Sequence, residues 1–213
     1  LVSDIGDDES GKKMLIALET EKVGIKFVSE HREQQSNYHY VLWYKDDRTI
    51  LVKHEEYTRT LPMIGNPRWI YLSSLGENSL PYHQAIEKYL SYHPEIKLAF
   101  QPGTFQMRLG IEALAPIYKR SEVFFCNTQE ARQILATEEK DVKKLLAWVA
   151  DLGPKIVVIT DGPAGAYVLE NNNYWHMPIY PDPQPPLERT GAGDAFASTF
   201  TAALALGKSV PEA

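Results

Sequence analysis

The sequence predicts an α/β fold with a doubly wound, mainly parallel sheet, helices on both faces and a small β-hairpin. Short apolar segments without polar alternation recur along the chain, and helical segments separate them, which is typical of a parallel sheet covered on both faces. The chain has 213 residues, of which 44% are hydrophobic and 23% are charged, an ordinary composition for a globular domain. We therefore expect one α/β domain over residues 1–213, with an inserted hairpin at about 23–57.

The first predicted elements are a helix, a short strand and a hairpin. Residues 12–20 form an amphipathic helical segment, and residues 23–28 form a short apolar strand. In residues 37–55, two runs of aromatic and β-branched side chains flank the polar turn Lys-Asp-Asp, which is typical of a β-hairpin. Both faces of this hairpin carry apolar side chains, so we expect it to cover a ligand or another surface.

After the hairpin, strands and helices alternate. The predicted strands are short and almost wholly apolar; they are residues 69–75, 96–100, 123–126 and 155–160. The predicted helices are amphipathic or rich in alanine; they are residues 82–93, 110–120, 128–136, 141–152 and 194–206. Residues 165–180 have the pattern of an antiparallel hairpin around an asparagine-rich turn.

Polar segments directly follow three of the predicted strands. They are Gln-Pro-Gly at 101–103, Asn-Thr-Gln-Glu at 127–130 and Thr-Asp-Gly at 160–162. In open α/β sheets, ligands bind at the carboxyl ends of the strands. The position of these segments therefore predicts a binding site at that edge of the sheet.

Composition argues against several partners and sites. The formal net charge is −6, whereas proteins that bind nucleic acid or anionic membranes usually present a basic face. No apolar run approaches the ~18 residues of a membrane span. The single cysteine, Cys126, permits no disulfide within the chain, as expected of a cytoplasmic protein, and its strand predicts a core position. The histidines show no zinc-binding spacing and are expected on the surface or in the hairpin.

The segment ERTGAGDAFASTF at 188–200 leaves two interpretations open. In the first, Gly191, Ala192 and Gly193 present backbone amides to a transferring phosphoryl group, and Asp194 accepts the proton of an attacking hydroxyl. In the second, the segment is a glycine turn with Asp194 as the helix N-cap. A dinucleotide fingerprint is excluded because no strand precedes the segment and its third glycine is missing. A P-loop is excluded because no Gly-Lys-Ser/Thr follows.

The segment TGAGDAFASTF closely resembles the second signature of the ribokinase-like sugar kinases, also called the phosphofructokinase-B (PfkB) family. Further segments are similar, in order, to the family's strand-to-helix segment, lid strand, N-x-x-E motif and glycine turn. They are VSDIGDDESGKKMLIAL at 2–18, DDRTILVKHE at 46–55, NTQEA at 127–131 and VVITDGPAGAYVL at 157–169. The resemblance covers nearly the whole chain. It implies the ribokinase-like fold and ATP-dependent phosphorylation of a hydroxyl group on a sugar or related small molecule.

The resemblance also implies roles for the matching residues. Asp194 corresponds to the catalytic base, and Gly191, Ala192 and Gly193 correspond to the anion hole for the γ-phosphate. Asn127 and Glu130 correspond to residues that organise Mg²⁺ and the nucleotide phosphates, with Mg²⁺ reached through water. The residues that correspond to the rest of the nucleotide-binding segments are Thr160, Asp161, Gly162, Gly165 and Thr190. The hairpin corresponds to the lid over the sugar, through which family members often form homodimers.

The chain departs from the family pattern in two ways. Glu188 and Arg189 stand where the family usually has Asp-Thr, next to a monovalent-cation site, so activation by potassium (K⁺) is not implied here. The family's first strand with its sugar-binding segment and its C-terminal helices are not in the sequence, so the resemblance implies a fragment. Arg108 lies where some members contact the substrate, and it is either an anion contact or a solvent-exposed arginine.

Two alternatives to a sugar kinase stay open from the sequence. Adenosine-type nucleoside kinases share the same motifs, so the acceptor is either a sugar or a nucleoside. A nucleotide-binding protein without turnover would keep the phosphate-binding segments and lack the sugar-binding part.

Overall fold

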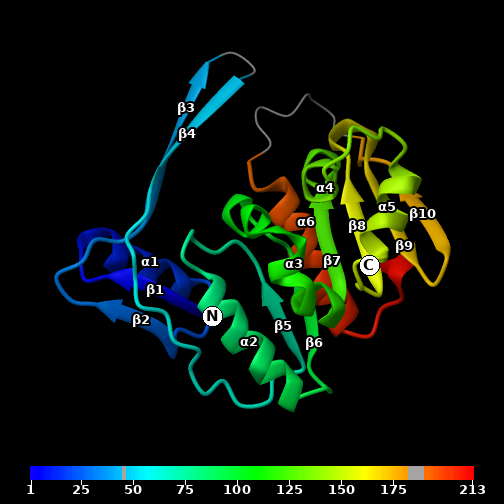
Figure 1. Ribbon diagram of the computed structural model, residues 1–213. Coiled ribbons are helices and arrows are strands. Elements are labelled where there is room, and N and C mark those ends of the chain that lie inside the picture. Colours follow the sequence, from blue (N-terminus) through cyan, green and yellow to red (C-terminus); the bar gives the residue numbers. More distant parts are fainter. Residues whose placement is uncertain (45–46, 182–189) are drawn as a thin grey trace. The chain divides into compact units, whose positions relative to one another are not determined.

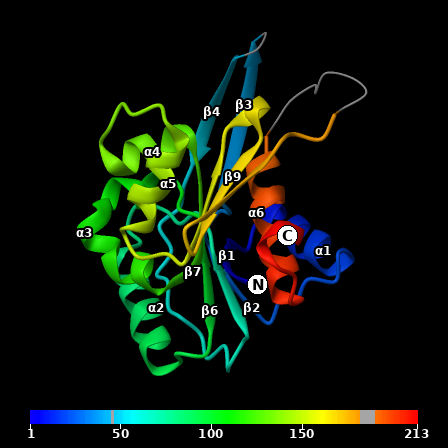
Figure 2. The same ribbon diagram turned by 90° about the vertical axis from the view of Figure 1, so that its right-hand side faces the viewer.

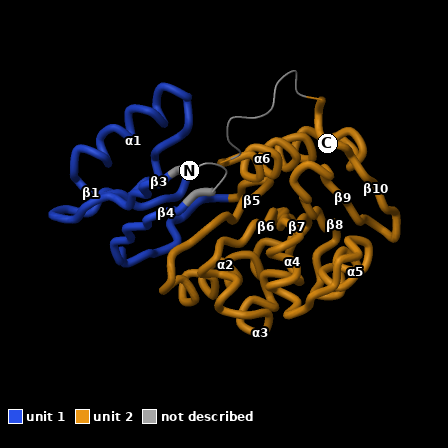
Figure 3. Tube along the Cα trace, turned by 90° about the horizontal axis from the view of Figure 1, so that it is seen from above, with its two compact units in different colours: residues 1–65 blue, residues 66–213 orange. Residues whose placement is uncertain are grey.

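Two compact units make up the chain in the computed structural model, which describes residues 1–44, 47–181 and 190–213. Unit 1 is Leu1–Gly65 and unit 2 is Asn66–Ala213 (Figure 3). The single domain over residues 1–213 with an insertion at about 23–57 stays a prediction. Among the described residues, no helix combines the length and the apolar character that crossing a membrane requires.

Unit 1 contains a strand–helix–strand segment followed by a hairpin (Figure 1). Its elements are β1 (Val2–Gly6), α1 (Glu9–Thr20), β2 (Phe27–His31), β3 (Tyr38–Tyr44) and β4 (Asp47–Lys53). Strands β1 and β2 pair in parallel, and β3 and β4 pair antiparallel. The predicted helix and hairpin are confirmed, whereas the short strand predicted at 23–28 begins later, at Phe27.

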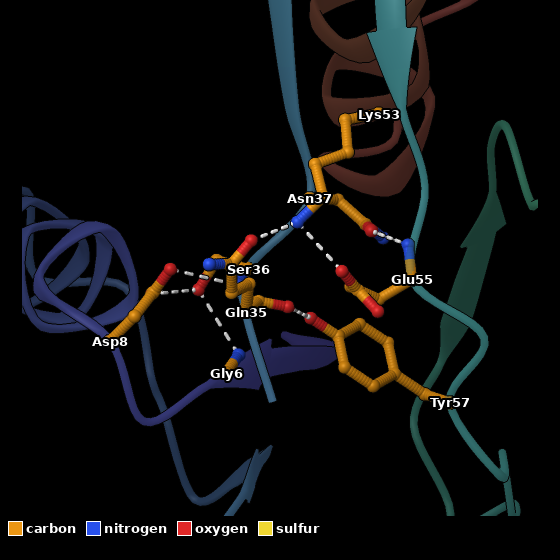
Figure 4. A network of polar contacts seen from close by, with 8 residues as sticks. All are labelled: Gly6, Asp8, Gln35, Ser36, Asn37, Lys53, Glu55 and Tyr57. Carbon is orange, nitrogen blue, oxygen red and sulfur yellow. Dashed lines mark hydrogen bonds and ion pairs between the residues drawn. The ribbon is translucent and has the colours of Figure 1, made fainter. Parts of the chain in front are cut away.

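Asp8 ties the start of α1 to the segment before the hairpin (Figure 4). Its carboxylate accepts hydrogen bonds from the Ser36 hydroxyl (2.7 Å) and the Ser36 amide (3.0 Å). It also accepts from the Gly11 amide (2.8 Å), and these hydrogen bonds lower the pKa of Asp8. The Ser36 side chain is fully buried, and its hydroxyl accepts a hydrogen bond from the Gly6 amide at 3.0 Å. Position 6 requires glycine because a Cβ there would lie 2.3 Å from the carbonyl oxygen of Gln34.

The base of the hairpin is held by contacts between its two arms (Figure 4). The Tyr57 hydroxyl donates to the carbonyl oxygen of Gln35 at 2.5 Å, and Asn37 Oδ1 accepts from the Glu55 amide at 2.5 Å. Lys53 Nζ donates across the hairpin to Oε1 of Gln35 and, within its own arm, forms an ion pair with Glu55 at 2.7 Å. Burial raises the pKa of Tyr57, so its hydroxyl remains a donor. These contacts fix where the two strands of the hairpin begin and end.

The hairpin itself carries exposed apolar side chains. Tyr40, Leu42 and Leu51 are 62%, 54% and 51% exposed. Gathered apolar side chains are typical of a surface that meets a ligand or another chain. The roles of the hairpin as a lid and as a dimer contact stay predictions.

A mainly parallel sheet forms the centre of unit 2 (Figure 1). Its strands are β5 (Trp69–Leu72), β6 (Lys97–Phe100), β7 (Ser121–Asn127), β8 (Ile156–Thr160), β9 (Ala166–Glu170) and β10 (Asn173–Met177). Within the described part of the chain they form a six-stranded sheet of order β10-β9-β8-β7-β6-β5. Strands β5 to β8 are parallel, and β9 and β10 form the predicted antiparallel hairpin. Asn171 and Asn172 have φ of 49° and 62°, as a tight hairpin turn requires.

Helices cover both faces of this sheet (Figure 2). One face carries α2 (Leu80–Tyr92), α3 (Thr104–Arg120), α4 (Thr128–Leu135) and α5 (Val142–Ala150), and the other carries α6 (Ala192–Ala205). The described residues of unit 2 also include two short 3-10 helices, η1 (Gly162–Ala164) and η2 (Val210–Glu212). Helix α3 begins earlier than predicted and is kinked at Gly110, where φ is 84°. The predicted doubly wound architecture is confirmed.

Strand alternation determines which side chains meet α6. Ala99 of β6 lies in one apolar cluster with Ala197 and Phe200 of α6. Phe100, the next residue, packs on the opposite face against Tyr118 of α3, with ring centroids 5.7 Å apart. Because successive side chains of a strand point to opposite faces, the residue after Phe100 projects toward the α6 side.

A buried amide connects the loops that follow β5 and β6. Gln106 is fully buried, and its Oε1 accepts hydrogen bonds from the amides of Gly103 (2.7 Å) and Leu75 (3.1 Å). Its Nε2 donates to the carbonyl oxygen of Ser73 (3.1 Å) and lies 3.0 Å from Nε2 of His83. The side chain thus uses both its donor and its acceptor groups to hold the two loops together.

The burial of His83 corrects a prediction, because all histidines were expected on the surface or in the hairpin. His83 is only 2% exposed and lies on the buried face of α2 with Ile86 and Leu90. Its Nδ1 lies 2.7 Å from the carbonyl oxygen of Ser79, so Nδ1 carries the proton and Nε2 accepts from Gln106. Burial lowers the pKa of His83, which agrees with this neutral form.

Acidification is expected to destabilise unit 2 through His83. The folded state lowers the pKa of His83, whereas an unfolded chain keeps the ordinary value of 6.5. Below that value the unfolded chain binds the proton more strongly, so the free energy of unfolding falls as the pH falls toward the folded-state pKa. We expect a loss of up to about 1.4 kcal/mol per pH unit. Urea unfolding at several pH values should show this slope in the wild type, and an equal slope in His83→Gln would contradict it.

Candidate functional site

The three polar segments predicted at the carboxyl edge of the sheet lie on neighbouring parallel strands. Gln101 follows β6, Asn127 ends β7 and Asp161 follows β8. Asn127 and Thr160 are directly paired across β7 and β8. The structure therefore brings these segments to one edge of the sheet, as the sequence predicts.

Asn127 and Glu130 form a capping box at the start of α4. Asn127 Oδ1 accepts from the Glu130 amide, and Glu130 Oε2 accepts from the Asn127 amide, both at 2.8 Å. Burial is the main cause that raises the pKa of Glu130, and the negative charge of Asp194 raises it further. The N-x-x-E motif therefore has a structural role at a helix end, and its carboxylate lies within the electrostatic influence of Asp194.

The turn after β8 is held by hydrogen bonds from two neighbouring elements. Thr128 Oγ1 donates to Asp161 Oδ1 at 2.8 Å, and the Asp161 amide donates to the carbonyl oxygen of Gly165 at 2.8 Å. His176 of β10 donates through Nε2 to the carbonyl oxygen of Ala164 at 2.8 Å. These contacts fix the glycine turn between the parallel part of the sheet and the β9–β10 hairpin.

Gly165 is required by both its conformation and its surroundings. Its φ is 92°, and a Cβ there would lie 2.1 Å from the carbonyl oxygen of Met177. We expect Gly165→Ala to lower the free energy of unfolding by about 2 kcal/mol or more, since the left-handed region alone costs roughly 1–2 kcal/mol. Gly24→Ala is the matched control, because a Cβ at position 24 meets nothing within 4 Å. Equal unfolding free energies for the two variants would contradict this account.

The glycine-rich segment forms the start of α6. Gly191 is the N-cap with φ of 79°, so Asp194 is the third residue of the helix and not its cap. The alternative interpretation of Asp194 as an N-cap is therefore wrong. The first amides of a helix have no acceptor within it, and here they belong to Ala192, Gly193 and Asp194. Thr190 precedes this turn, and the segment from Thr190 to Asp194 is exposed.

The sequence analysis assigned no individual role to two residues near Asp194, Gln101 of the predicted 101–103 segment and Tyr71. Gln101 donates through Nε2 to Asp194 Oδ1 at 2.9 Å. The Tyr71 hydroxyl of β5 donates to Oε1 of Gln101. The position of Gln101 immediately after a buried strand predicted that it lies at this edge, but not that it contacts Asp194. No feature of the sequence around Tyr71 indicated a place in the site.

The remaining predicted residues lie apart from these contacts or outside the described residues. Arg108 is exposed on α3 and stacks on Phe105, with its guanidinium carbon 5.5 Å from the ring centroid. No contact between Arg108 and the other candidate residues is seen among the residues that the structure describes. Glu188 and Arg189 fall in 182–189, outside the described residues.

A separate cavity of about 600 Å³ lies at the opposite, amino edge of the sheet. It is lined by the starts of β5 and β6 and by the end of α6, with Arg68, Trp69, Lys97 and Leu206 among its residues. None of the predicted site residues lines it. The candidate site is therefore the carboxyl edge, where the polar segments gather.

The chain matches known proteins over much of its length. The pfkB family of carbohydrate kinases matches residues 1–213. A cytidine kinase of Thermococcus kodakarensis is 36% identical over 104 residues, which are 47% of this chain and 36% of that protein. An ATP-dependent 6-phosphofructokinase of Thermoanaerobacterium thermosaccharolyticum is 25% identical over 221 residues, 97% of this chain and 67% of that protein. The matched part is thus little more than a third of the cytidine kinase.

Solved structures share the fold. Arabidopsis thaliana ribokinase in complex with ribose and ATP has a TM-score of 0.81 at 20% identity, covering 99% of this chain and 70% of that one. A putative ribokinase II of E. coli in complex with ATP and Mg²⁺ has a TM-score of 0.78 at 17% identity, covering 99% and 71%. The match over the whole of residues 1–213 establishes the family. The chain belongs to the pfkB family of carbohydrate kinases and has the ribokinase-like α/β fold.

Proposed function

We propose that the protein transfers the γ-phosphoryl group of ATP to a hydroxyl group of a sugar or a nucleoside. The acceptor oxygen forms a bond to the γ-phosphorus while the bond from that phosphorus to the bridging oxygen breaks, and ADP leaves. Asp194 takes the proton of the hydroxyl as general base. The observation that carries the proposal is the exposed position of Asp194 in the first turn of α6, directly after the Gly191 turn.

The start of α6 is suited to binding the transferred group. The amides of the first helical turn have no acceptor within the helix, and a helix N-terminus carries a partial positive charge. In this proposal Gly191, Ala192 and Gly193 form the anion hole, with glycine at 191 allowing the positive φ of the turn. Phosphoryl transfer needs mostly positioning and charge stabilisation, which this arrangement would supply.

The nucleotide would bind along the same edge of the sheet. The capping-box pair Asn127 and Glu130 would organise its phosphates, and the remaining contacts would come from Thr160, Asp161, Gly162, Gly165 and Thr190. The hydrogen bonds that fix the turn at 161–165 support this role, because a fixed turn presents the same backbone groups to every ligand. The E. coli structure with ATP and Mg²⁺ has the same fold, which is consistent with ATP as the phosphoryl donor.

Mg²⁺ fits the chemistry of these residues when it is held through water. Mg²⁺ prefers oxygen ligands and usually keeps several waters. Among the residues described, no three histidine, cysteine, aspartate or glutamate side chains gather as a direct metal site. We assign Glu130 as the residue that would hold the ion through a water. When bound, the ion would neutralise charge on the nucleotide phosphates.

The acceptor is either a sugar or a nucleoside. The ribokinase and phosphofructokinase relatives favour a sugar, and the cytidine kinase, with 36% identity, favours a nucleoside. Arg108 is our candidate contact for an anionic acceptor, because its guanidinium is exposed on α3.

A coupled ADP-release assay on the intact protein tests this proposal. ATP and Mg²⁺ would be supplied with pentoses, hexoses, sugar acids and nucleosides in separate reactions. We expect release well above the acceptor-free background with at least one compound. Binding of ATP without release above that background would instead favour a nucleotide-binding protein without turnover.

A further inference from the structure

Gln101 links Asp194 of α6 to Tyr71 of β5. The Gln101 side chain donates to Asp194 Oδ1 at 2.9 Å and accepts from the Tyr71 hydroxyl. Its backbone amide donates to the carbonyl oxygen of Leu72 at 2.9 Å, which extends the ladder between β5 and β6 by one residue. The backbone of Gln101 is therefore held by the sheet, and its side chain extends from there to Asp194, the proposed base.

The direction of both hydrogen bonds follows from the chemistry of the groups. An ionised carboxylate only accepts hydrogen bonds, so the Gln101 amide must present its NH₂ group to Asp194. Its oxygen then faces Tyr71, which must donate. Burial, with a smaller contribution from the charge of Asp194, raises the pKa of Tyr71 to about 12. The phenol therefore keeps its proton at neutral pH and holds the amide in one orientation.

We propose that Gln101 is a positioning residue for Asp194, and that Tyr71 fixes the orientation of the Gln101 amide. The inference rests on the proposed role of Asp194 as general base. Asp194 is exposed, so its side chain would otherwise sample several rotamers. With Oδ1 held by the amide, Oδ2 is the oxygen that accepts the proton of the acceptor hydroxyl.

The charges around Asp194 explain why a neutral donor suits position 101. Tyr71 is neutral, and Gln101 adds no charge. A second carboxylate at position 101 would face Asp194 Oδ1 across the 2.9 Å that the amide now spans, and like charges at such a distance cannot both stay ionised.

Three variants of the intact enzyme test the positioning role. Gln101→Ala removes the donor, and we expect kcat to fall about 10- to 100-fold, with the KM values for ATP and acceptor unchanged. Gln101→Glu keeps the size of the side chain but introduces the second carboxylate, and kcat should fall at least as far. Tyr71→Phe frees the amide to turn, and kcat should fall about 2- to 10-fold.

Two controls separate positioning from folding. Gln84 is an exposed glutamine on α2, and Gln84→Ala should leave kcat and the unfolding midpoint unchanged. In an Asp194→Asn background, Gln101→Ala should cause no further loss of kcat, because Gln101 acts through Asp194.

The outcomes distinguish this inference from the proposed function. Full kcat in Gln101→Glu, a change in KM alone, or an additive loss in the Asp194→Asn background would overturn the positioning role and leave the base assignment intact. Retained turnover in Asp194→Asn by itself would overturn the base assignment and, with it, the inference.

Discussion

Replacing Asp194 with asparagine is expected to lower kcat for phosphoryl transfer by about 10²- to 10⁴-fold, the usual contribution of a general base. Asparagine has nearly the same size as aspartate but cannot take the proton of the hydroxyl. Asp194 does not cap α6, because Gly191 is the N-cap residue. The fold and the affinity for ATP should therefore be preserved.

Steady-state kinetics measure the expected loss of kcat, and calorimetric titration with ATP measures the affinity that should be preserved. Asp151→Asn is the matched control, because Asp151 is an exposed aspartate at the end of α5, away from the carboxyl edge. It should leave kcat unchanged. Turnover of Asp194→Asn equal to that of the control would remove Asp194 from the mechanism, and a parallel loss of ATP binding would point to a structural role.

Replacing Gln106 with leucine is expected to give the largest loss of stability among the changes considered. The fully buried amide satisfies two backbone amides, one carbonyl oxygen and Nε2 of His83. Leucine has a similar volume and satisfies none of them. Each buried polar group left without a partner costs about 1–3 kcal/mol, so we expect a loss of at least about 3 kcal/mol.

Urea unfolding of Gln106→Leu and of Gln84→Leu measures this effect. Gln84 lies exposed on α2, so its replacement tests the same change of residue type without burial. The control should change the free energy of unfolding by less than about 0.5 kcal/mol. A loss in Gln106→Leu as small as that of the control would show that the loops after β5 and β6 are held by other contacts.

The parallel sheet could be predicted from the sequence because its signals are local. Runs such as Val123–Cys126 and Ile156–Ile159 are apolar at every position, and all of these residues are buried. The turn at Asn171 and Asn172 could likewise be predicted, because asparagine tolerates the positive φ that this turn requires. Each of these features depends on neighbours along the chain.

The contacts of Asp194 could not be predicted, because they join residues far apart in sequence. Gln101 and Asp194 are 93 positions apart, and no local pattern marks Tyr71 as the donor to Gln101. The N-cap of α6 was also ambiguous, since glycine and aspartate both begin helices. The positive φ observed at Gly191 identifies this glycine as the N-cap residue.

The burial of His83 could have been found from the sequence. His83, Ile86 and Leu90 have the i, i+3, i+7 spacing of one helix face, and all three are buried. The residue type suggested the surface, and the spacing indicated the core. The partner that makes burial possible, Gln106, lies on another helix and required the structure.

The most direct test of the central claim is to follow the label from γ-³²P-ATP with the intact protein, Mg²⁺ and the acceptor that gives the most ADP. If Asp194 activates an acceptor hydroxyl at the start of α6, the label appears in a phosphate ester of the acceptor, and Asp194→Asn loses this product. Label that appears only as inorganic phosphate, or an ester formed equally well by Asp194→Asn, would contradict the account.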